Sequence, residues 1–196
     1  MTSQTQTLTA PPAGADWLKA YYFTRAAVSV AWVAAAFAVA RTSPLASDGL
    51  LVLYPAWDAA ANLVDARRNG GLARSPTQAL NAGVSLLTAI AVAIAATHGP
   101  NAVLAVIGVW ASLSGLLQLA TGVRRWKTYG AQWAMALSGA QSTLAGVIFL
   151  KRASAMAAPN ATSIAPYALF GAFYFLVSAI WLTVTERRRR ATAAAA

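Results

Sequence analysis

The chain has 196 residues, of which 58% are hydrophobic and 10% charged, and its formal net charge is +10. Soluble domains carry about 25% charged residues, so too few charges remain here to cover a surface in water. The composition therefore predicts an integral membrane protein and excludes a separate soluble domain. The absence of cysteine excludes disulfides, thiolate catalysis and cysteine metal sites.

Six apolar segments follow one another along the chain. Residues 1–15 carry no side-chain charge and are rich in Thr, Gln, Ser and Pro, which predicts a disordered tail. Residues 16–190 form the predicted membrane domain, and residues 191–196 a C-terminal tail. The spans are expected near 21–40, 49–67, 77–97, 101–123, 132–150 and 165–185. All six should be helices, because a lipid-facing strand would leave backbone groups unpaired.

The six spans repeat as three helical hairpins. Ala79–Leu87 aligns with Ala136–Leu144 at an offset of 57 residues, and Arg25–Ser29 aligns with Asn81–Ser85 at an offset of 56. The turn prolines Pro44, Pro100 and Pro159 recur at nearly the same period. The predicted fold is therefore all-α, with hairpins at about 21–67, 77–123 and 132–185.

Lysine and arginine are distributed unequally between the two sides of the predicted bundle. One side would carry 12 of them and the other only Arg41, Lys151 and Arg152. This bias predicts a multi-pass protein of the cytoplasmic membrane with both termini in the cytoplasm. The positive charge is thus explained without nucleic acid. Anionic lipid is the expected partner of the cytoplasmic arginines, and the Ala-rich helices could also pair as a homo-oligomer.

The first hairpin differs from the other two in its polar residues. Asp58 aligns with Gly115 and Ser178, and Arg25 aligns with Asn81 and Ser138. Small residues at the other copies are typical of closely packed membrane helices. Any specific activity is therefore expected in the first hairpin.

Tyr54, Asp58, Asn62 and Asp65 follow the i, i+4, i+8, i+11 spacing and share one face of the second span. Reflecting the hairpin about Pro44 places Arg25 level with residue 63, so we expect Arg25 to meet Asn62 or Asp65. Asp58 would lie about two turns deeper without a cation at its level. It is either a proton-titratable or polar-ligand site, or a structural group: a protonated side chain whose hydrogen bonds hold the bundle together, or one that faces a small water pocket.

The third and fifth spans carry weakly polar residues at helical spacing: Asn81, Ser85 and Thr88, and Ser138, Ser142 and Ala145. Interhelical packing is the favoured interpretation, and a hydrophilic lining for transport is the alternative. The sequence has no phosphate-binding loop, no zinc-protease helix and no hydrolase elbow, and His98 is its only histidine. We therefore expect no enzyme, no cofactor and no metal site.

The chain resembles the HdeD-like family of short six-span bacterial membrane proteins. The resemblance covers about residues 20–190 and is best at Val106–Gly115, Gly122–Arg125, Trp133–Gly139 and Leu144–Val147. It implies a cytoplasmic-membrane location and a loose link to acid or envelope stress, and it supplies no catalytic residues. The chain departs from the pattern at Pro55, Trp57 and Asp58, which stand in place of small and apolar residues.

The resulting expectation is a non-enzymatic membrane protein of the HdeD-like type that acts by helix–helix contacts. The alternative is a small proton-coupled transporter or channel with Asp58 as the titratable site. The two differ in whether Asp58 faces a cavity that water can reach.

Overall fold

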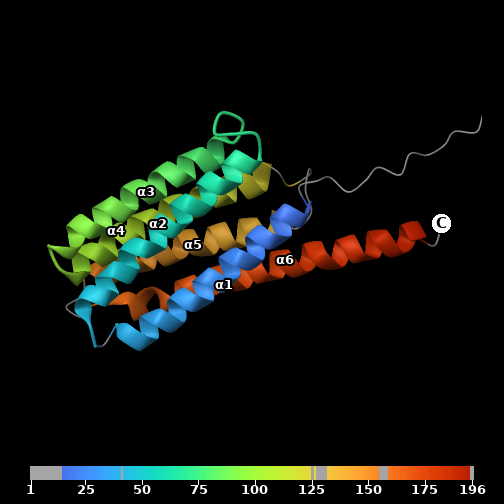
Figure 1. The fold of residues 1–196 in the computed structure, drawn as a ribbon. Helices are drawn as coiled ribbons and strands as arrows, with labels where there is room; N and C mark the ends of the chain where they lie inside the picture. Colours follow the sequence, from blue (N-terminus) through green and yellow to red (C-terminus); the bar gives the residue numbers. More distant parts are fainter. Residues whose placement is uncertain (1–14, 41, 125, 127–131, 155–158, 195–196) are drawn as a thin grey trace, which may run out of the picture.

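The computed structural model is a bundle of long helices (Figure 1). The structure describes all residues except 1–14, 41, 125, 127–131, 155–158 and 195–196, so nearly all of the predicted N-terminal tail lies outside the described residues. Within the described residues the helices are α1 Ala15–Val39, α2 Pro44–Arg68, α3 Pro76–Ala96, α4 Pro100–Arg124, α5 Gln132–Ala153, the short 3-10 helix η1 Ala161–Ile164, and α6 Ala165–Ala194. The predicted all-α fold with six long helices is confirmed.

Prolines and glycines set the helix ends. Pro44 and Pro100 each occupy the first residue of a helix, where the missing N–H and the fixed φ of proline cost nothing. Ser43 caps α2 by accepting a hydrogen bond from the Ala46 amide at 3.2 Å. At the other end of α2, Gly70 and Gly71 have φ of 93° and 92°, a conformation that favours glycine. The second span, predicted near 49–67, thus ends within one residue of the observed end of α2 at Arg68.

Five helices are long and apolar enough to cross a membrane: α1, α3, α4, α5 and the η1–α6 segment. The helix outside this group is α2, because Asp58, Asn62 and Asp65 lower its hydropathy. All three side chains are buried, whereas Leu53 and Val64 on the outer face of the same helix are 60% and 42% exposed. With 25 residues, α2 is also long enough to span. We therefore treat α2 as the sixth span.

Large apolar side chains are exposed on every helix of the bundle. They include Phe37 on α1, Leu87 on α3, Leu116 on α4, Leu144 on α5 and Phe173 on α6, each more than half exposed. In water such a surface would aggregate, whereas in a bilayer it faces lipid tails. The structure thus supports an integral membrane location with the lipid bilayer as solvent.

The six helices form a closed ring. Consecutive helices contact one another, and α6 returns to lie beside α1 (Figure 1). Within this ring the closest pairs are α4–α5, α2–α3 and α1–α6, which join one predicted hairpin to the next. The α1–α2 and α5–α6 contacts are sparser. The repeat therefore gives a ring in which the tightest packing lies between successive hairpins.

Glycine explains why α4 and α5 approach most closely. A Cβ built on Gly115 would lie 2.5 Å from the Thr143 amide nitrogen and 2.7 Å from the Gly139 carbonyl oxygen. Gly108 faces the Gly146 carbonyl in the same way, one heptad away. The two backbones thus pack directly against each other, as small residues allow in membrane bundles.

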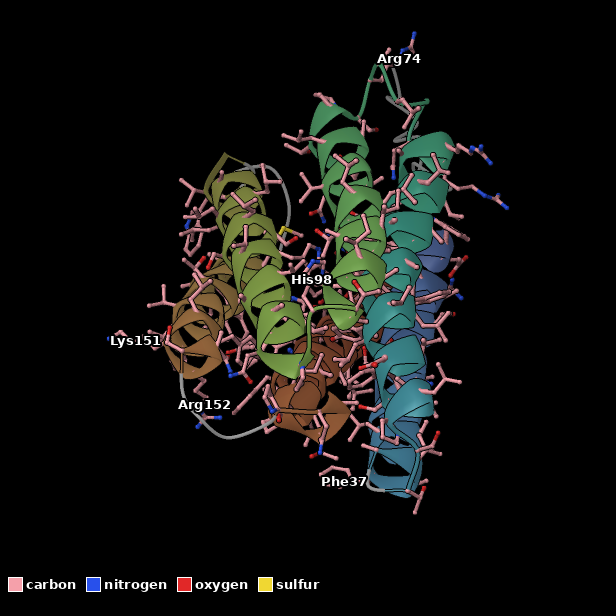
Figure 2. All side chains as sticks on the ribbon, turned by 90° about the vertical axis from the view of Figure 1, so that its left-hand side faces the viewer. Phe37, Arg74, His98, Lys151 and Arg152 are labelled. Atoms are coloured by element: carbon pink, nitrogen blue, oxygen red, sulfur yellow. The ribbon has the colours of Figure 1, made fainter. Side chains whose placement is uncertain are left out.

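The two ends of the bundle differ in charge. We call the end that contains Arg67, Arg68 and Arg74 the arginine-rich end; α1 begins there and α6 ends there. In Figure 2 Arg74 stands at the top of the view, whereas Lys151 and Arg152 lie towards the opposite end. The last turns of α6 extend beyond the neighbouring helices, and the helix continues through Ala194, so residues 191–194 of the predicted tail are helical (Figure 1).

Candidate functional site

The polar face of α2 points into the bundle. Asp58, Asn62 and Asp65 are 7–9% exposed, and together with Tyr54 they line one cavity. The i, i+4, i+8, i+11 spacing therefore places all four side chains on the interior face, as predicted.

Asp58 is the centre of a hydrogen-bond network that joins four helices. Its Oδ2 accepts from Ser85 Oγ at 2.8 Å, from Asn62 Nδ2 at 3.0 Å and from Asn81 Nδ2 at 3.5 Å. Its Oδ1 accepts from Arg25 Nη2 on α1 and forms an ion pair with it. Trp110 Nε1 on α4 in turn donates to Ser85 Oγ at 2.9 Å. The network thus connects α1, α2, α3 and α4.

The Arg25–Asp58 ion pair corrects two predictions. Arg25 was expected to meet Asn62 or Asp65, and Asp58 was expected to have no cation at its level; both expectations are wrong. In a hairpin, residues equally far from the middle of the turn lie side by side. Because α1 ends at Val39 and α2 begins at Pro44, the point of reflection lies midway between these two helix ends and not at Pro44. This shifts the partner of Arg25 from residue 63 to residue 58, about 7.5 Å along the helix.

Asp65 instead binds groups near the arginine-rich end. Its Oδ1 accepts from Asn69 Nδ2 at 2.8 Å, and its Oδ2 accepts from Gln78 Nε2 at 3.3 Å. These amides close the end of α2 against the start of α3. Asp65 therefore belongs to the entrance of the cavity and Asp58 to its interior.

Aromatic side chains surround the guanidinium of Arg25. Nη1 donates to the Tyr21 hydroxyl at 3.0 Å, and the guanidinium carbon lies 4.3 Å from the centroid of the Phe175 ring on α6. Such stacking and pairing stabilise an arginine away from water. Arg25 thereby touches α2 through Asp58 and α6 through Phe175.

A cavity of about 530 Å³ lies in the middle of the ring. All six helices contribute to its lining, which extends from Tyr54, Trp110 and Tyr167 to Leu18, Arg74 and Leu182 at the arginine-rich end. Asp58 and Arg25 lie between these limits. The cavity volume is in the range of sites that bind small molecules.

Equivalent positions of the three repeats meet in this cavity. Arg25, Asn81 and Ser138 align in the sequence and all line it, as do the aligned Asp58 and Ser178. Asn81, Ser138 and Ser142 thus line the cavity, whereas transport along this lining stays a prediction. Ser85 and Thr88, by contrast, are buried between helices.

An aromatic cluster closes the cavity on the side away from the arginine-rich end. The Tyr54 ring lies 4.8 Å from Trp32 and 5.7 Å from Trp110, and the Tyr167 ring lies 6.2 Å from both Tyr54 and Trp110. Beyond these rings Val92, Val103, Leu104, Ile107 and Ile164 belong to the buried apolar core. We call the rings of Trp32, Tyr54, Trp110 and Tyr167 the aromatic floor. The cavity therefore reaches one end of the bundle only.

Sequence reasoning missed the roles of Trp110, Tyr167 and Tyr174. Tyr167 and Ser142 have their hydroxyls 3.0 Å apart, and the Tyr174 hydroxyl donates to Gln141 Oε1 at 2.8 Å. Nothing in the spacing of Tyr167 and Tyr174 separates them from the exposed aromatics Phe170 and Phe173 on α6. Trp110 is the one aromatic residue of α4, so no pattern on that helix marks it. The lone His98 is exposed in the turn between α3 and α4, outside the cavity lining. Among the described residues no cluster of His, Asp and Glu is arranged to hold a metal ion.

Residues 80–151, which cover α3 to α5, match the family described as a short repeat of unknown function (DUF308), which contains HdeD-type proteins. The match covers less than half of the chain, and it supports the resemblance at the level of this repeat. No curated protein and no solved structure matches the chain. Arg25 and Asp58 lie outside the matched segment.

Proposed function

We propose that this chain is a non-enzymatic multi-pass membrane protein that carries a small polar solute through its central cavity, with Asp58 as a proton-titratable site. One observation carries the proposal: a polar cavity of about 530 Å³ lies inside a bundle whose outer surface is apolar. Polar and ionisable groups are costly within a membrane and usually face a binding site or a water path. A protein that acted by packing alone would fill this space with small and apolar side chains.

The contacts between the helices support a movement that would open the cavity first to one side of the membrane and then to the other. The helices α2 to α5 contact one another closely, and α1 and α6 form a second close pair. Contacts between these two groups, at α1–α2 and α5–α6, are sparser. Many transporters move one such group against the other around a central site. The Arg25–Asp58 ion pair joins the two groups, so its breakage would accompany the movement.

The orientation follows from the charge bias. Because lysine and arginine gather in cytoplasmic loops, the arginine-rich end is expected in the cytoplasm. The cavity would then be open to the cytoplasm and closed to the outside by the aromatic floor. Arg67, Arg68 and Arg187–Arg190 are exposed at this end, which supports anionic lipid as a further partner. The homo-oligomer stays a prediction.

Proteoliposomes test the proposal. Wild-type protein is reconstituted in vesicles that contain a pH-sensitive dye, and proton entry is followed after a panel of polar solutes is added outside. Asp58→Asn should abolish solute-dependent proton entry. Asp48→Asn is the matched control, because Asp48 lies on the same helix but outside the cavity lining. If Asp58→Asn conducts like wild type, Asp58 is not the transport site. If wild type shows no flux with any solute, the transport proposal fails.

The second candidate is the role that the HdeD-like resemblance implies, in which helix–helix contacts serve acid or envelope stress. The backbone contact of Gly115 with Gly139 favours it, because this contact lies in the segment that matches the repeat and uses no cavity residue. The two candidates differ in a deletion strain exposed to acid. If the Asp58→Asn variant restores survival of this strain and Gly115→Leu does not, the role in helix–helix contacts is supported. If Gly115→Leu restores survival and Asp58→Asn does not, transport through the cavity is supported.

A further inference from the structure

We infer that the cavity takes an uncharged solute that carries several hydroxyl or amide groups. This inference rests on the proposed function, since it names the class of molecule that the same cavity would hold. It follows from the charge balance of the lining, from the chemistry of its uncharged groups, and from buried polar atoms there that lack a partner.

The charges of the lining compensate one another. The lining contains two arginines, Arg25 and Arg74, and two aspartates, Asp58 and Asp65. In the interior, Arg25 and Asp58 are paired with each other, so neither is left to balance the charge of a ligand. An anion or a cation in this space would remain without a counter-charge, which is costly away from water. The lining therefore disfavours ionic solutes.

The uncharged polar groups of the lining are mostly amides and hydroxyls. They come from all six helices and the loop between α2 and α3, and they include Asn62, Asn81, Ser114, Gln141 and Tyr174. Amides and hydroxyls both donate and accept hydrogen bonds. A ligand with hydroxyl or amide groups distributed over its surface can pair with such a lining in many directions.

Four polar atoms at the site are buried and have no hydrogen-bond partner among the described residues: Arg25 Nε, Trp57 Nε1, Asn81 Oδ1 and Ser114 Oγ. All four residues line the cavity, and Ser114 is only 8% exposed. Arg25 Nε and Trp57 Nε1 are donors, Asn81 Oδ1 is an acceptor, and Ser114 Oγ can be either. A hydroxyl group can accept from the two donors and donate to Asn81 Oδ1. A carboxylate can only accept and an ammonium can only donate, so each would leave at least one of these atoms unpaired.

The size and the floor of the cavity agree with this class. A volume of about 530 Å³ holds a molecule of several carbon atoms together with some water. The rings of Tyr54, Trp110 and Tyr167 at its inner limit offer apolar contact to the carbon atoms of such a solute.

Uptake into proteoliposomes tests the inference with labelled glycerol, mannitol and glucose as neutral probes, and with glutamate and choline as charged ones. At least one neutral probe should enter faster than both charged probes. Asn81→Leu should reduce its uptake about tenfold, since a buried hydrogen bond is lost. Ser114→Ala should also reduce it, whereas Ser154→Ala, at an exposed residue just after α5 and outside the lining, should not. Equilibrium dialysis of the same probes against the detergent-solubilised protein separates binding from transport.

The outcomes separate the inference from the proposed function. Uptake of glutamate or choline in preference to every neutral probe would overturn the inference and leave transport intact. Binding of a neutral probe without uptake would support the inference and contradict transport. If no probe binds or enters, both are wrong. Gln141→Glu guards against misfolding of the leucine variant, because a glutamate oxygen can still accept from the Tyr174 hydroxyl while the added carboxylate should lower neutral uptake and raise that of choline.

Discussion

The Arg25–Asp58 pair gives the sharpest test of the site's energetics. In Asp58→Asn the new amide has one oxygen and one NH₂ group. If the amide oxygen faces Arg25, the new NH₂ group points at the NH₂ group of Asn62, and both are donors. If the new NH₂ group faces Arg25, it points at the guanidinium N–H groups, which are also donors. Either orientation therefore sets two hydrogen-bond donors against each other, and the buried arginine loses its counter-ion. Removing one partner of a buried ion pair costs about 3–5 kcal/mol.

A double-mutant cycle measures the pairwise part of this cost. Arg25→Gln with Asp58→Asn removes both charges and lets two amides pair, so the double variant should be more stable than the sum of the single effects by about 0.5–3 kcal/mol. The assay is thermal unfolding in detergent. On the scale of about 2–4 °C per kcal/mol for a chain of this size, Asp58→Asn should lower Tm by about 6–20 °C. Asp48→Asn, outside the cavity lining, should change stability by less than about 0.5 kcal/mol. Additive single effects, or an Asp58→Asn variant as stable as the Asp48→Asn control, would refute the ion pair.

Two further predictions concern packing and topology. Gly115→Ala should destabilise the bundle by about 1–3 kcal/mol, because the added Cβ would lie 2.5 Å from the Thr143 amide nitrogen. Gly83→Ala, whose Cβ meets nothing within 4 Å, should stabilise α3 by about 0.5–1 kcal/mol; thermal unfolding that ranks the two variants equally would contradict the close contact. Because the chain has no cysteine, Leu72→Cys and His98→Cys each introduce a unique thiol at an exposed position. A membrane-impermeant maleimide added to intact cells should label His98→Cys but not Leu72→Cys, and the opposite pattern would reverse the predicted orientation.

Much of the fold could be predicted because each signal is local to one helix. Hydropathy identifies five of the six helices as spans, Pro44 and Pro100 mark helix starts, and the glycine pair after Arg68 marks an end. Helical spacing likewise places Tyr54, Asp58, Asn62 and Asp65 on one face, because 3.6 residues per turn leave little freedom.

The partners of these residues could not be predicted in the same way. Whether Arg25 meets Asp58 or Asp65 depends on where the middle of one short turn lies. An error of two or three residues in that position shifts the residue expected opposite Arg25 by twice as many residues. The contacts of Asp58 with Ser85, and of Ser85 with Trp110, also depend on how the second hairpin packs against the first. No spacing within a single helix contains this information.

By itself, the sequence determined the membrane class, the six helices, their repetition in three hairpins and the concentration of ionisable groups in the first of them. The tertiary structure alone decided that the closest pairs lie between successive hairpins, that Arg25 neutralises Asp58, and that equivalent positions of the three copies surround a cavity. The physical reason is that periodicity along a helix fixes which face a residue occupies. Its height relative to a neighbouring helix is set by turn geometry and by contacts such as that of Gly115 with Thr143.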